Sequence, residues 1–446
     1  MIFSLQIALS FIILCNEIFR SKKYQFDFFT LFNVVYFICY VVAPISGFFM
    51  KDEWQKYSVM RYTIKGVQYD NPNFYSIGIL TILTYLIIVF SFSFFRYRTS
   101  IYKKSLFFVD DDYRFLLKYT KVLFFISVLA LLYSAYSAGG LLKWMVSNPR
   151  LYYANDALEV EEQSWILSKL TRCIIICCYF YFALILHLKS KKIPITIWTY
   201  IFFATSFLLS LVVVIHSGGR FLMFQFFGIL FLTFVIGRRL KFDLKKVAIV
   251  VLFGGSVLLY GRTFFQFFIY DNALDSLREK SSESGIDKFF GVMNNYTFPF
   301  FSAINNFSYD FLDWNFFRDF LLWPLNFLPP SFRPNFEFDS TAINTFRLMG
   351  EYKRFVPSDV ISYGLINFGV TGVLIVSVFF GWLLKYFNST IDLTNRNYLA
   401  SCIYSILAFL ICFRVMYFDP YHFIKGSFEF ISIIFFIPFF RKIKTE

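Results

Sequence analysis

The chain has 446 residues, of which 58% are hydrophobic and only 16% are charged. Soluble globular proteins carry roughly a quarter charged residues, so this composition excludes an ordinary water-surrounded enzyme. Phenylalanine contributes 67 residues and tyrosine another 30, more than one aqueous core could hold. The sequence therefore predicts an all-α, polytopic integral membrane protein that contacts membrane lipids.

The formal net charge of +14 does not indicate a nucleic-acid partner, because lysine and arginine cluster in short tracts between long apolar runs. The seven cysteines lack metal-ligand spacing, and there are only three histidines. The sequence thus predicts no metal centre, and nothing in it requires a cofactor.

Runs free of charged side chains predict about eleven transmembrane helices, since most match the roughly 17–25 residues that cross the hydrocarbon core. In chain order the runs are 2–15, 28–50, 71–95, 122–142, 173–186, 193–219, 221–237, 247–261, 360–384, 397–413 and 430–440. The first run lacks a basic n-region and a small-residue cleavage site, which favours an uncleaved helix over a signal peptide.

The orientation follows from five basic tracts that fall in alternate loops. The positive-inside rule assigns all of them to the cytoplasm. The tracts are Arg20/Lys22/Lys23, Arg96/Arg98/Lys103/Lys104, Lys189/Lys191/Lys192, Arg238/Arg239/Lys241/Lys245/Lys246 and Arg441/Lys442/Lys444. We expect a cytoplasmic C-terminus and, with an odd number of helices, an outer N-terminus.

The chain divides into three parts: 1–263 with helices one to eight, a large extracytoplasmic loop at 264–358, and 359–446 with helices nine to eleven. A loop of this length is usually functional. It carries an amphipathic aromatic stripe, which predicts a segment lying along the outer membrane interface. The stripe consists of Phe311, Trp314, Phe317, Phe320 and Trp323. The rings could anchor the loop in lipid or line a sugar-binding groove.

Arginines gather at the predicted outer ends of several helices. Arg220 follows the turn His216-Ser217-Gly218-Gly219 and opens a helix, whose free amides make a plausible anion site together with its guanidinium. Arg262, Arg414 and Arg172 are expected in the same leaflet. Snorkelling to lipid phosphate explains any single arginine. Four together favour a diphosphate ligand, which guanidinium groups bind bidentately.

The long loop adds a further cation and the outer loops supply two candidate bases. Arg333 lies among the prolines of 329–334, which would hold it rigidly. His422 and Asp359 are expected on the outer side, where either could accept a proton from a sugar hydroxyl. Both have simpler interpretations, because His422 could be an interfacial histidine and Asp359 could cap the ninth helix.

Three stretches give the chain a resemblance to the O-antigen polymerase family. They are Ser217-Gly218-Gly219-Arg220, Trp323-Pro324 through Pro329-Pro330-Ser331-Phe332-Arg333-Pro334, and Pro357-Ser358-Asp359 through Asn367-Phe368-Gly369. The last looks like the family's P-(S/T)…G-E-x-Y-x-N-F-G pattern, although Ser362 stands where many relatives place an acidic residue.

The resemblance implies a membrane-embedded, GT-C-like glycosyltransferase of the bacterial inner membrane. Such an enzyme moves a glycan from undecaprenyl diphosphate to the next lipid-linked oligosaccharide repeat unit at the outer face. The resemblance also implies a chain-length regulator as a candidate protein partner. Arg220, Arg262, Arg333 and Arg414 would then stabilise the departing diphosphate, and His422 or Asp359 would act as base.

Two other functions stay open at this point. An O-antigen ligase has a similar architecture and donor but transfers the glycan to a lipid A core. A lipid-linked oligosaccharide flippase would need charges along the whole depth of the bilayer. The outward gathering of the arginines favours chemistry at one face over transport.

Overall fold

The computed structural model describes residues 3–20, 27–49, 71–95, 113–146, 165–217, 220–238, 289, 293, 296–310, 313–322, 339–350, 356–390, 398–420 and 423. These residues form helices and connecting turns, with no strand among them. By spatial contacts the chain forms two compact units, each assembled from separate stretches of sequence.

Seven helices in the described part of the chain are long and apolar enough to cross a membrane. They are Phe28–Phe49, Asn73–Phe94, Tyr113–Ser137, Leu167–Ser190, Ile197–His216, Val360–Ser389 and Tyr398–Val415. Two shorter apolar helices cover Ser4–Phe19 and Leu222–Arg238. The all-helical, polytopic membrane class is therefore confirmed, whereas the count of eleven spans stays a prediction. The expected spans 247–261 and 430–440 lie outside the described residues.

One helix begins well before its charge-free run. We expect each helix to extend a few residues beyond its run, and for the run 122–142 the helix covers Tyr113–Ser137. Long basic side chains can enter a membrane helix near its end, because the charged tip reaches back to water. Lys121 is half-buried in this helix, and its Nζ lies 5.8 Å from the centre of the Phe202 ring.

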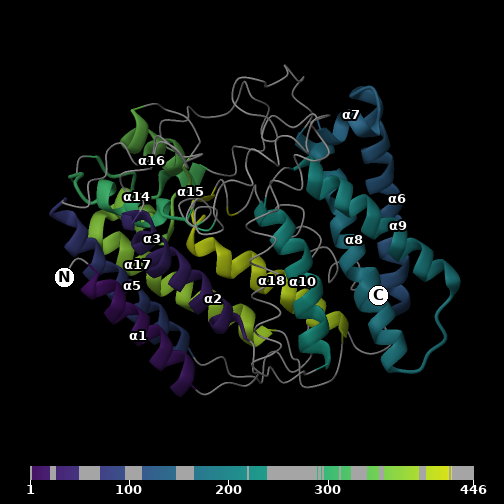
Figure 1. Cartoon of the computed structure of the whole chain (residues 1–446), viewed down its shortest axis with the longest axis horizontal. Coiled ribbons are helices and arrows are strands. Elements are labelled where there is room, and N and C mark those ends of the chain that lie inside the picture. Colours follow the sequence, from purple (N-terminus) through teal and green to yellow (C-terminus); the bar gives the residue numbers. More distant parts are fainter. Residues whose placement is uncertain are drawn as a thin grey trace. The chain divides into compact units, whose positions relative to one another are not determined.

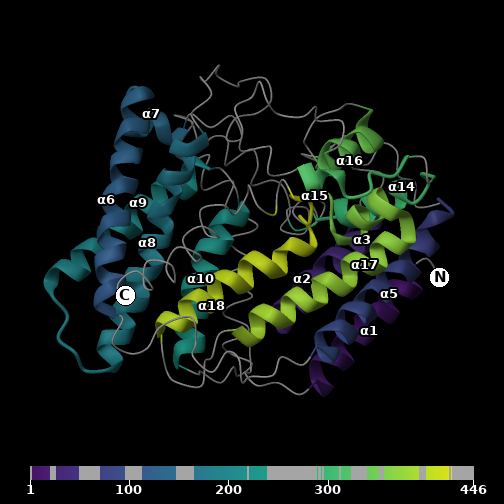
Figure 2. The same cartoon turned by 180° about the vertical axis from the view of Figure 1, so that it is seen from behind.

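The first unit contains 1–99, 285–389 and 410–427. In chain order its helices are α1 (Ser4–Phe19), α2 (Phe28–Phe37), the π-helical turn η1 (Ile38–Val42), α3 (Ala43–Phe49), α5 (Asn73–Phe94), α14 (Phe298–Asn306), α15 (Arg318–Leu322), α16 (Ser340–Met349), α17 (Val360–Thr390) and the short η8 (Phe413–Val415). Helices α1, α2, α5 and α17 run side by side in both views (Figures 1 and 2).

The second unit contains 100–284, 390–409 and 428–446. Its helices are α6 (Tyr113–Ser137), α7 (Leu141–Val146), α8 (Trp165–Ser190), α9 (Ile197–His216), α10 (Arg220–Arg238) and most of α18 (Tyr398–Cys412). Within this unit α18 packs against α10 through two glycines, because a Cβ at Gly228 would collide with the Phe409 ring and one at Gly237 with the Tyr398 ring.

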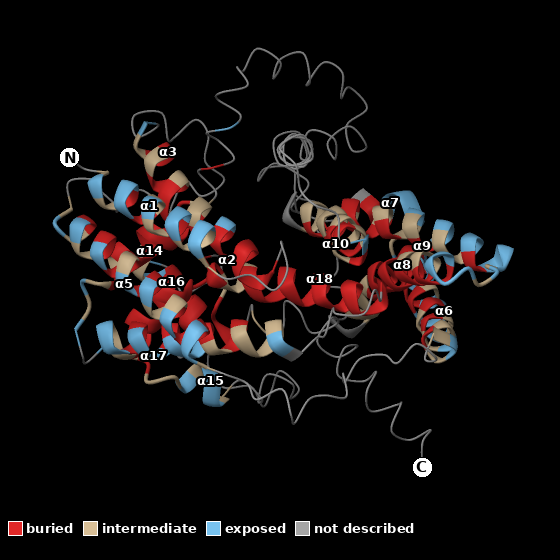
Figure 3. Ribbon diagram, turned by 90° about the horizontal axis from the view of Figure 1, so that it is seen from below, coloured by how far each residue is buried: buried red, intermediate tan, exposed pale blue. Residues whose placement is uncertain are grey.

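Apolar side chains cover the outer surfaces of the helices as well as the core, which is the pattern of helices in lipid. Figure 3 shows exposed faces on α1, α5 and α6. On α6 the exposed face is made of Val122, Phe125, Ile126, Leu129, Leu132, Tyr133 and Tyr136. In water this face would be an aggregation surface, so its composition supports a membrane-embedded protein.

Helix α17 is broken, although the apolar run 360–384 predicts one straight span. Phe368 and Gly369 have non-helical backbone angles, and Gly369 has a φ of 57° and a ψ of −144°. A Cβ on Gly364 would lie 2.5 Å from the Cα of Val373. In a continuous helix these residues would be about 13 Å apart along the axis. The segment 360–367, here called the half-helix, therefore folds back on the rest of α17.

A loop from the long segment closes the carbonyl end of the half-helix. The backbone N–H groups of Asn315 and Phe316 donate to the carbonyls of Ile366 and Asn367 at 2.8 and 3.2 Å. The Asn367 side chain accepts from Phe317 N at 2.5 Å and donates to Tyr363 O at 2.8 Å. These bonds satisfy carbonyls that a helix end would otherwise leave unpaired inside the protein.

Replacing Gly364 by alanine is expected to destabilise the protein by about 1–3 kcal/mol, because the new methyl group meets backbone atoms that cannot rotate away. Thermal unfolding of the purified protein in detergent measures the effect. Val370 lies just beyond the break and is 46% exposed, so Val370→Leu is the size control. An unchanged midpoint for Gly364→Ala would contradict the fold-back of the half-helix.

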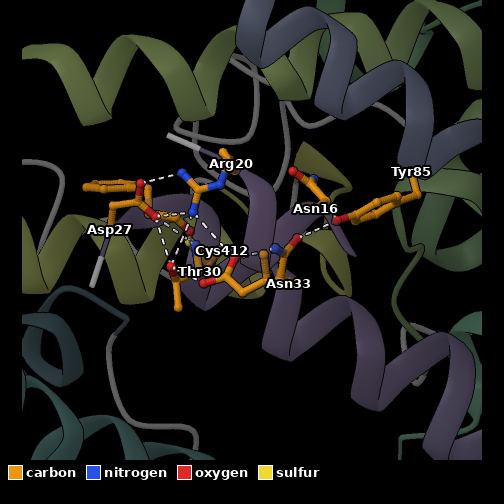
Figure 4. A network of polar contacts seen from close by, with 9 residues as sticks. Asn16, Arg20, Asp27, Thr30, Asn33, Tyr85 and Cys412 are labelled. Atoms are coloured by element: carbon orange, nitrogen blue, oxygen red, sulfur yellow. Dashed lines mark hydrogen bonds and ion pairs between the residues drawn. The ribbon is translucent and has the colours of Figure 1, made fainter. Parts of the chain in front are cut away.

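A network of polar side chains connects three helices of the first unit (Figure 4). Arg20 donates two hydrogen bonds to the Asp27 carboxylate, at 2.6 and 2.8 Å, and Asp27 also accepts from Thr30 N to cap α2. Asn33 donates to Glu17 at 2.7 Å and accepts from the Tyr85 hydroxyl at 2.9 Å. The network therefore links α1 to α2 by charge-assisted bonds and joins α5 to both through the neutral Tyr85 hydroxyl.

Candidate functional site

The half-helix begins at a capping carboxylate. Asp359 Oδ2 accepts from Ile361 N at 3.1 Å, Oδ1 accepts from Ser362 N at 3.2 Å, and its carbonyl accepts from Tyr363 N. This is N-cap geometry, in which a side chain satisfies the free amides of the first turn. Asp359 is completely buried. Burial raises its pKa to about 6, against hydrogen bonds from Ser362, Tyr40 and the backbone that lower it.

A tyrosine from a distant helix also binds this carboxylate. The Tyr40 hydroxyl donates to Asp359 Oδ2, and the two residues are 319 positions apart. Tyr40 belongs to the π-helical turn η1, which joins α2 to α3. Single π-turns inside α-helices occur frequently at functional sites. The bond joins the start of the half-helix to the middle of the Phe28–Phe49 helix.

Two further segments meet the chain just before the half-helix. Phe418 N donates to Ser358 O at 2.8 Å, and Ser358 N donates to Asp419 Oδ2 at 3.2 Å. The Ser358 hydroxyl donates to Ser340 O at 3.0 Å. Asp339 caps α16 by accepting from Thr341 N. The start of α17, the start of α16 and the chain after η8 therefore converge around one buried polar region.

Asp319 enters this region from α15. Its Oδ1 accepts from the Tyr363 hydroxyl at 3.1 Å and from Phe320 N at 2.9 Å. Its Oδ2 is buried and makes no hydrogen bond of good geometry in the described structure, although the Ser340 hydroxyl lies close enough to interact with the carboxyl group. Burial raises the pKa of Asp319 to about 7, and the nearby charges of Asp339 and Asp419 raise it further, against hydrogen bonds from Ser340 and Tyr363. Asp319 is thus a carboxyl group that titrates near neutral pH.

Four aspartates therefore surround the half-helix, and we call this group the aspartate cluster: Asp319, Asp339, Asp359 and Asp419. Three of them have roles in holding the backbone, since Asp339 and Asp359 cap helices and Asp419 accepts from Ser358 N. Asp319 differs, because its Oδ2 makes no hydrogen bond of good geometry in the described structure. Among the described residues, no group of three or more His, Cys, Asp or Glu side chains is arranged to hold a metal ion.

Arg414 is the one predicted cation that the structure describes in the first unit. It lies in η8, and its guanidinium carbon is 5.6 Å from the centre of the Phe423 ring. Four residues later, Phe418 pairs with Ser358. The Arg414 turn and Asp359 therefore lie at the same end of this unit.

Two other predicted cations belong to the second unit. Arg172 on α8 lies close enough to His216, at the end of α9, to interact with it electrostatically. His216 Nδ1 is 2.7 Å from Trp144 O, and its ring stacks on Trp144 at 3.8 Å. Helix α9 ends at His216 and helix α10 begins at Arg220, so only three residues separate the two helices, and of these 218 and 219 lie outside the described residues. The end of α9 and Arg172 therefore share one end of this unit.

Arg262, Arg333 and His422 lie outside the described residues, so their roles stay predictions.

No family model, curated protein or solved structure matches this chain.

Part of the aromatic stripe supports the break in α17. Trp314 covers Gly369, where a Cβ would lie 2.6 Å from its ring. The Phe317 ring is 5.7 Å from that of Tyr363 and 5.3 Å from that of Phe368. Phe320 is 58% exposed, and Phe311 and Trp323 lie outside the described residues. Trp314 and Phe317 thus pack against α17, and a sugar-binding groove stays a prediction.

Sequence reasoning missed Tyr40 and Asp319. Tyr40 lies within an apolar run and has no local signal, because its partner is 319 positions away. Asp319 did have a local sequence signal, since it is a carboxylate inside the aromatic stripe, at the start of a short helix. A charged residue among membrane-associated aromatics is costly unless it has a function or a partner.

Proposed function

We propose that this chain is an integral membrane glycosyltransferase that polymerises undecaprenyl-diphosphate-linked oligosaccharide repeat units at the outer face of the bacterial inner membrane. The observation that carries the proposal is the α9–α10 hairpin. Arg220 is the first residue of the apolar helix α10, and α9 ends at His216, which lies close enough to Arg172 to interact with it electrostatically. Helix N-termini and arginines both favour a diphosphate.

The proposed chemistry needs cations for the leaving group and a base for the acceptor. Arg172, Arg220, Arg262, Arg333 and Arg414 would stabilise the diphosphate charge that grows as the glycosidic bond breaks. Asp359 suits the base role less than its sequence position suggests, because both its oxygens accept hydrogen bonds and it is completely buried. His422 remains the sequence-based candidate for that step.

One observation favours a second function, a flippase for the same lipid-linked oligosaccharide. Transporters commonly contain discontinuous helices at their substrate sites, and α17 is discontinuous at Phe368 and Gly369. Against this, the break is sealed by protein, since Trp314 and the N–H groups of 315–317 occupy it. The sealed break supports a fixed scaffold for chemistry more than a transport path.

A single reconstitution separates the candidates. The purified protein is incubated in lipid nanodiscs with the undecaprenyl-diphosphate-linked repeat unit. The repeat unit is extracted from host cells that lack this protein. We expect products that differ by one repeat unit, resolved as a ladder on a gel. Transfer to added lipid A core instead of a ladder would identify a ligase. The absence of both products, together with movement of the lipid across sealed vesicles, would identify a flippase.

A further inference from the structure

One end of the second unit carries cations on three neighbouring helices. They belong to the start of α6, to the end of α8 and to the connection that leads into α9, and Figures 1 and 2 show these helices side by side. We call this group the basic end, and Lys121 is its half-buried member, whereas the others are exposed. The group consists of Arg114, Lys118, Lys121, Lys189, Lys191 and Lys192.

Contacts at two levels show that these parts of the helices share one end of the unit. The rings of Phe124 on α6 and Phe202 on α9 are 5.3 Å apart. Further along, the carbonyl of Trp144, which follows α6, lies 2.7 Å from His216 Nδ1 at the end of α9. Helices α6 and α9 therefore run in the same direction. Helix α8 reaches the start of α9 through the short connection 191–196, so its last residues lie at that end too.

The helices that form the basic end contain no acidic residue of their own. The sequence has no aspartate or glutamate in 113–155 or in 163–242, which include α6, α8 and α9. Asp110, Asp111 and Asp112 precede α6 and lie outside the described residues. A cluster of lysines at the end of membrane helices favours an anionic partner, and a membrane supplies one at this depth as the phosphate of an anionic lipid.

Exposed apolar side chains follow the cations along α6 and α9. Lys121 Nζ lies 5.8 Å from the centre of the Phe202 ring, so this cation lies where α6 meets α9. Val122 on α6 and Trp198 and Ile201 on α9 are exposed. A phospholipid has both of the groups that such a surface binds, since its phosphate attracts lysines and its acyl chains cover apolar side chains.

Lys192 has a backbone conformation that normally favours glycine. Its φ is 57°, in the left-handed region, and Ile193 N donates to Leu188 O at 3.0 Å to close the end of α8. Glycine is the usual residue in this position, because a side chain is strained there. Strained residues of this kind gather at functional sites. The presence of a lysine therefore indicates that its side chain has a use outside the helix.

We propose that the basic end binds an anionic phospholipid of the leaflet that it faces. Lys118 and Lys121 on α6, together with Lys189 and Lys192 after α8, hold the phosphate, and the acyl chains lie along the exposed apolar side chains of α6 and α9. The bound lipid connects α6 to the α8–α9 hairpin and stabilises the second unit. This inference concerns one unit alone and does not depend on the polymerase function.

Retention of phosphatidylglycerol by the purified full-length protein tests the proposal. The protein in mild detergent is titrated with phosphatidylglycerol or with phosphatidylcholine, which has no net charge, and native mass spectrometry counts the bound lipids. We expect phosphatidylglycerol to bind more tightly and to raise the unfolding temperature. Combining Lys118→Gln with Lys121→Gln should weaken its binding about 25-fold, because each lysine near an anionic headgroup contributes about fivefold.

Lys192→Gly separates lipid binding from folding. Glycine adopts the left-handed conformation without strain, so this variant should be at least as stable as the wild type when no anionic lipid is present. Its binding of phosphatidylglycerol should nevertheless weaken about fivefold. A stable variant that binds phosphatidylglycerol as tightly as the wild type would overturn the proposal.

Lys385 on α17 of the first unit is a matched control. It is also half-buried over an aromatic ring, with its Nζ 4.9 Å from the centre of Phe92. It differs because it lies near the ion pair of Arg20 and Asp27, whose carboxylate repels an anionic lipid. Lys385→Gln should therefore keep the wild-type affinity for phosphatidylglycerol.

Three other results would overturn the proposal. The first is an equal loss of affinity in Lys385→Gln and in the double variant of α6, since it would show a general attraction of charge. The second is equal binding of phosphatidylglycerol and phosphatidylcholine by the wild type. The third is an equal rise in the unfolding temperature with inorganic phosphate, since it would show a site for a free anion instead of a lipid.

Discussion

Replacing Asp27 by alanine should lower the free energy of unfolding by about 3–5 kcal/mol, because it removes one partner of a mostly buried ion pair. The Arg20 and Asp27 side chains are only 11% and 4% exposed. After the substitution, Glu17 at 3.4 Å is the carboxylate that the Arg20 guanidinium keeps, beside its hydrogen bond to Thr30 Oγ1 at 3.3 Å. The α2 helix also loses its N-cap, which adds about 1 kcal/mol. Equilibrium unfolding of the protein in mixed micelles measures the change.

Two variants divide this effect into its parts. Asp27→Asn keeps a capping side chain but removes the charge. It should therefore recover only the part of the free energy of unfolding that comes from capping α2. Glu17→Gln keeps one oxygen that can accept from Asn33 or Thr30 and removes the weaker ion pair, so its effect should be smaller than that of Asp27→Ala. Equal stability of Asp27→Ala and the wild type would show that Arg20 does not depend on Asp27.

The sequence predicted the membrane helices well because their signal is local. A run of apolar residues long enough to cross a bilayer has few alternatives, and the helices at Phe28–Phe49 and Asn73–Phe94 match their runs closely. The start of α6 lies well before its charge-free run because lysines inside its first turns interrupt the apolar signal without interrupting the helix.

The break in α17 could not be read from its apolar run, because the fold-back depends on partners far away in sequence. Asn367, Phe368 and Gly369 are compatible with a helix, and a lone glycine in a span is common. The alternative conformation is favoured by Trp314 over Gly369 and by the bond from Phe317 N to Asn367. These contacts cross about fifty positions, beyond any periodicity.

The stretch Pro357–Gly369 nevertheless contains the residues that build the site. Asp359 caps the half-helix, Gly364 lets it pack on α17, Asn367 binds the covering loop, and Gly369 adopts a positive φ. Each of these four residues is needed for a physical reason. Together they specify a short helix that begins at Asp359, ends near Asn367 and folds back on the rest of α17. The sequence alone left two roles open for Asp359, and the capping role is now confirmed.

Replacing Arg220 by alanine should reduce chain extension by about 10²–10³-fold, the usual effect of removing one preorganised group that stabilises charge in a transition state. Arg220 is the first residue of α10, and the free amides of a helix N-terminus favour an anion in the same way as an arginine does. Arg220→Lys should restore only part of the rate, because an ammonium group cannot bind a diphosphate through two parallel hydrogen bonds. The measurement is the initial rate of ladder formation in nanodiscs.

Arg238 provides a matched control on the same helix. It closes α10 at the opposite end, and its guanidinium carbon lies 4.6 Å from the centre of the Phe234 ring. The positive-inside rule predicts a cytoplasmic position for Arg238, away from the proposed donor diphosphate. Arg238→Ala should therefore keep the ladder, although both variants remove one arginine from α10. Equal losses in the two variants would mean that α10 needs its arginines for insertion or folding, and the diphosphate role of Arg220 would have to be withdrawn.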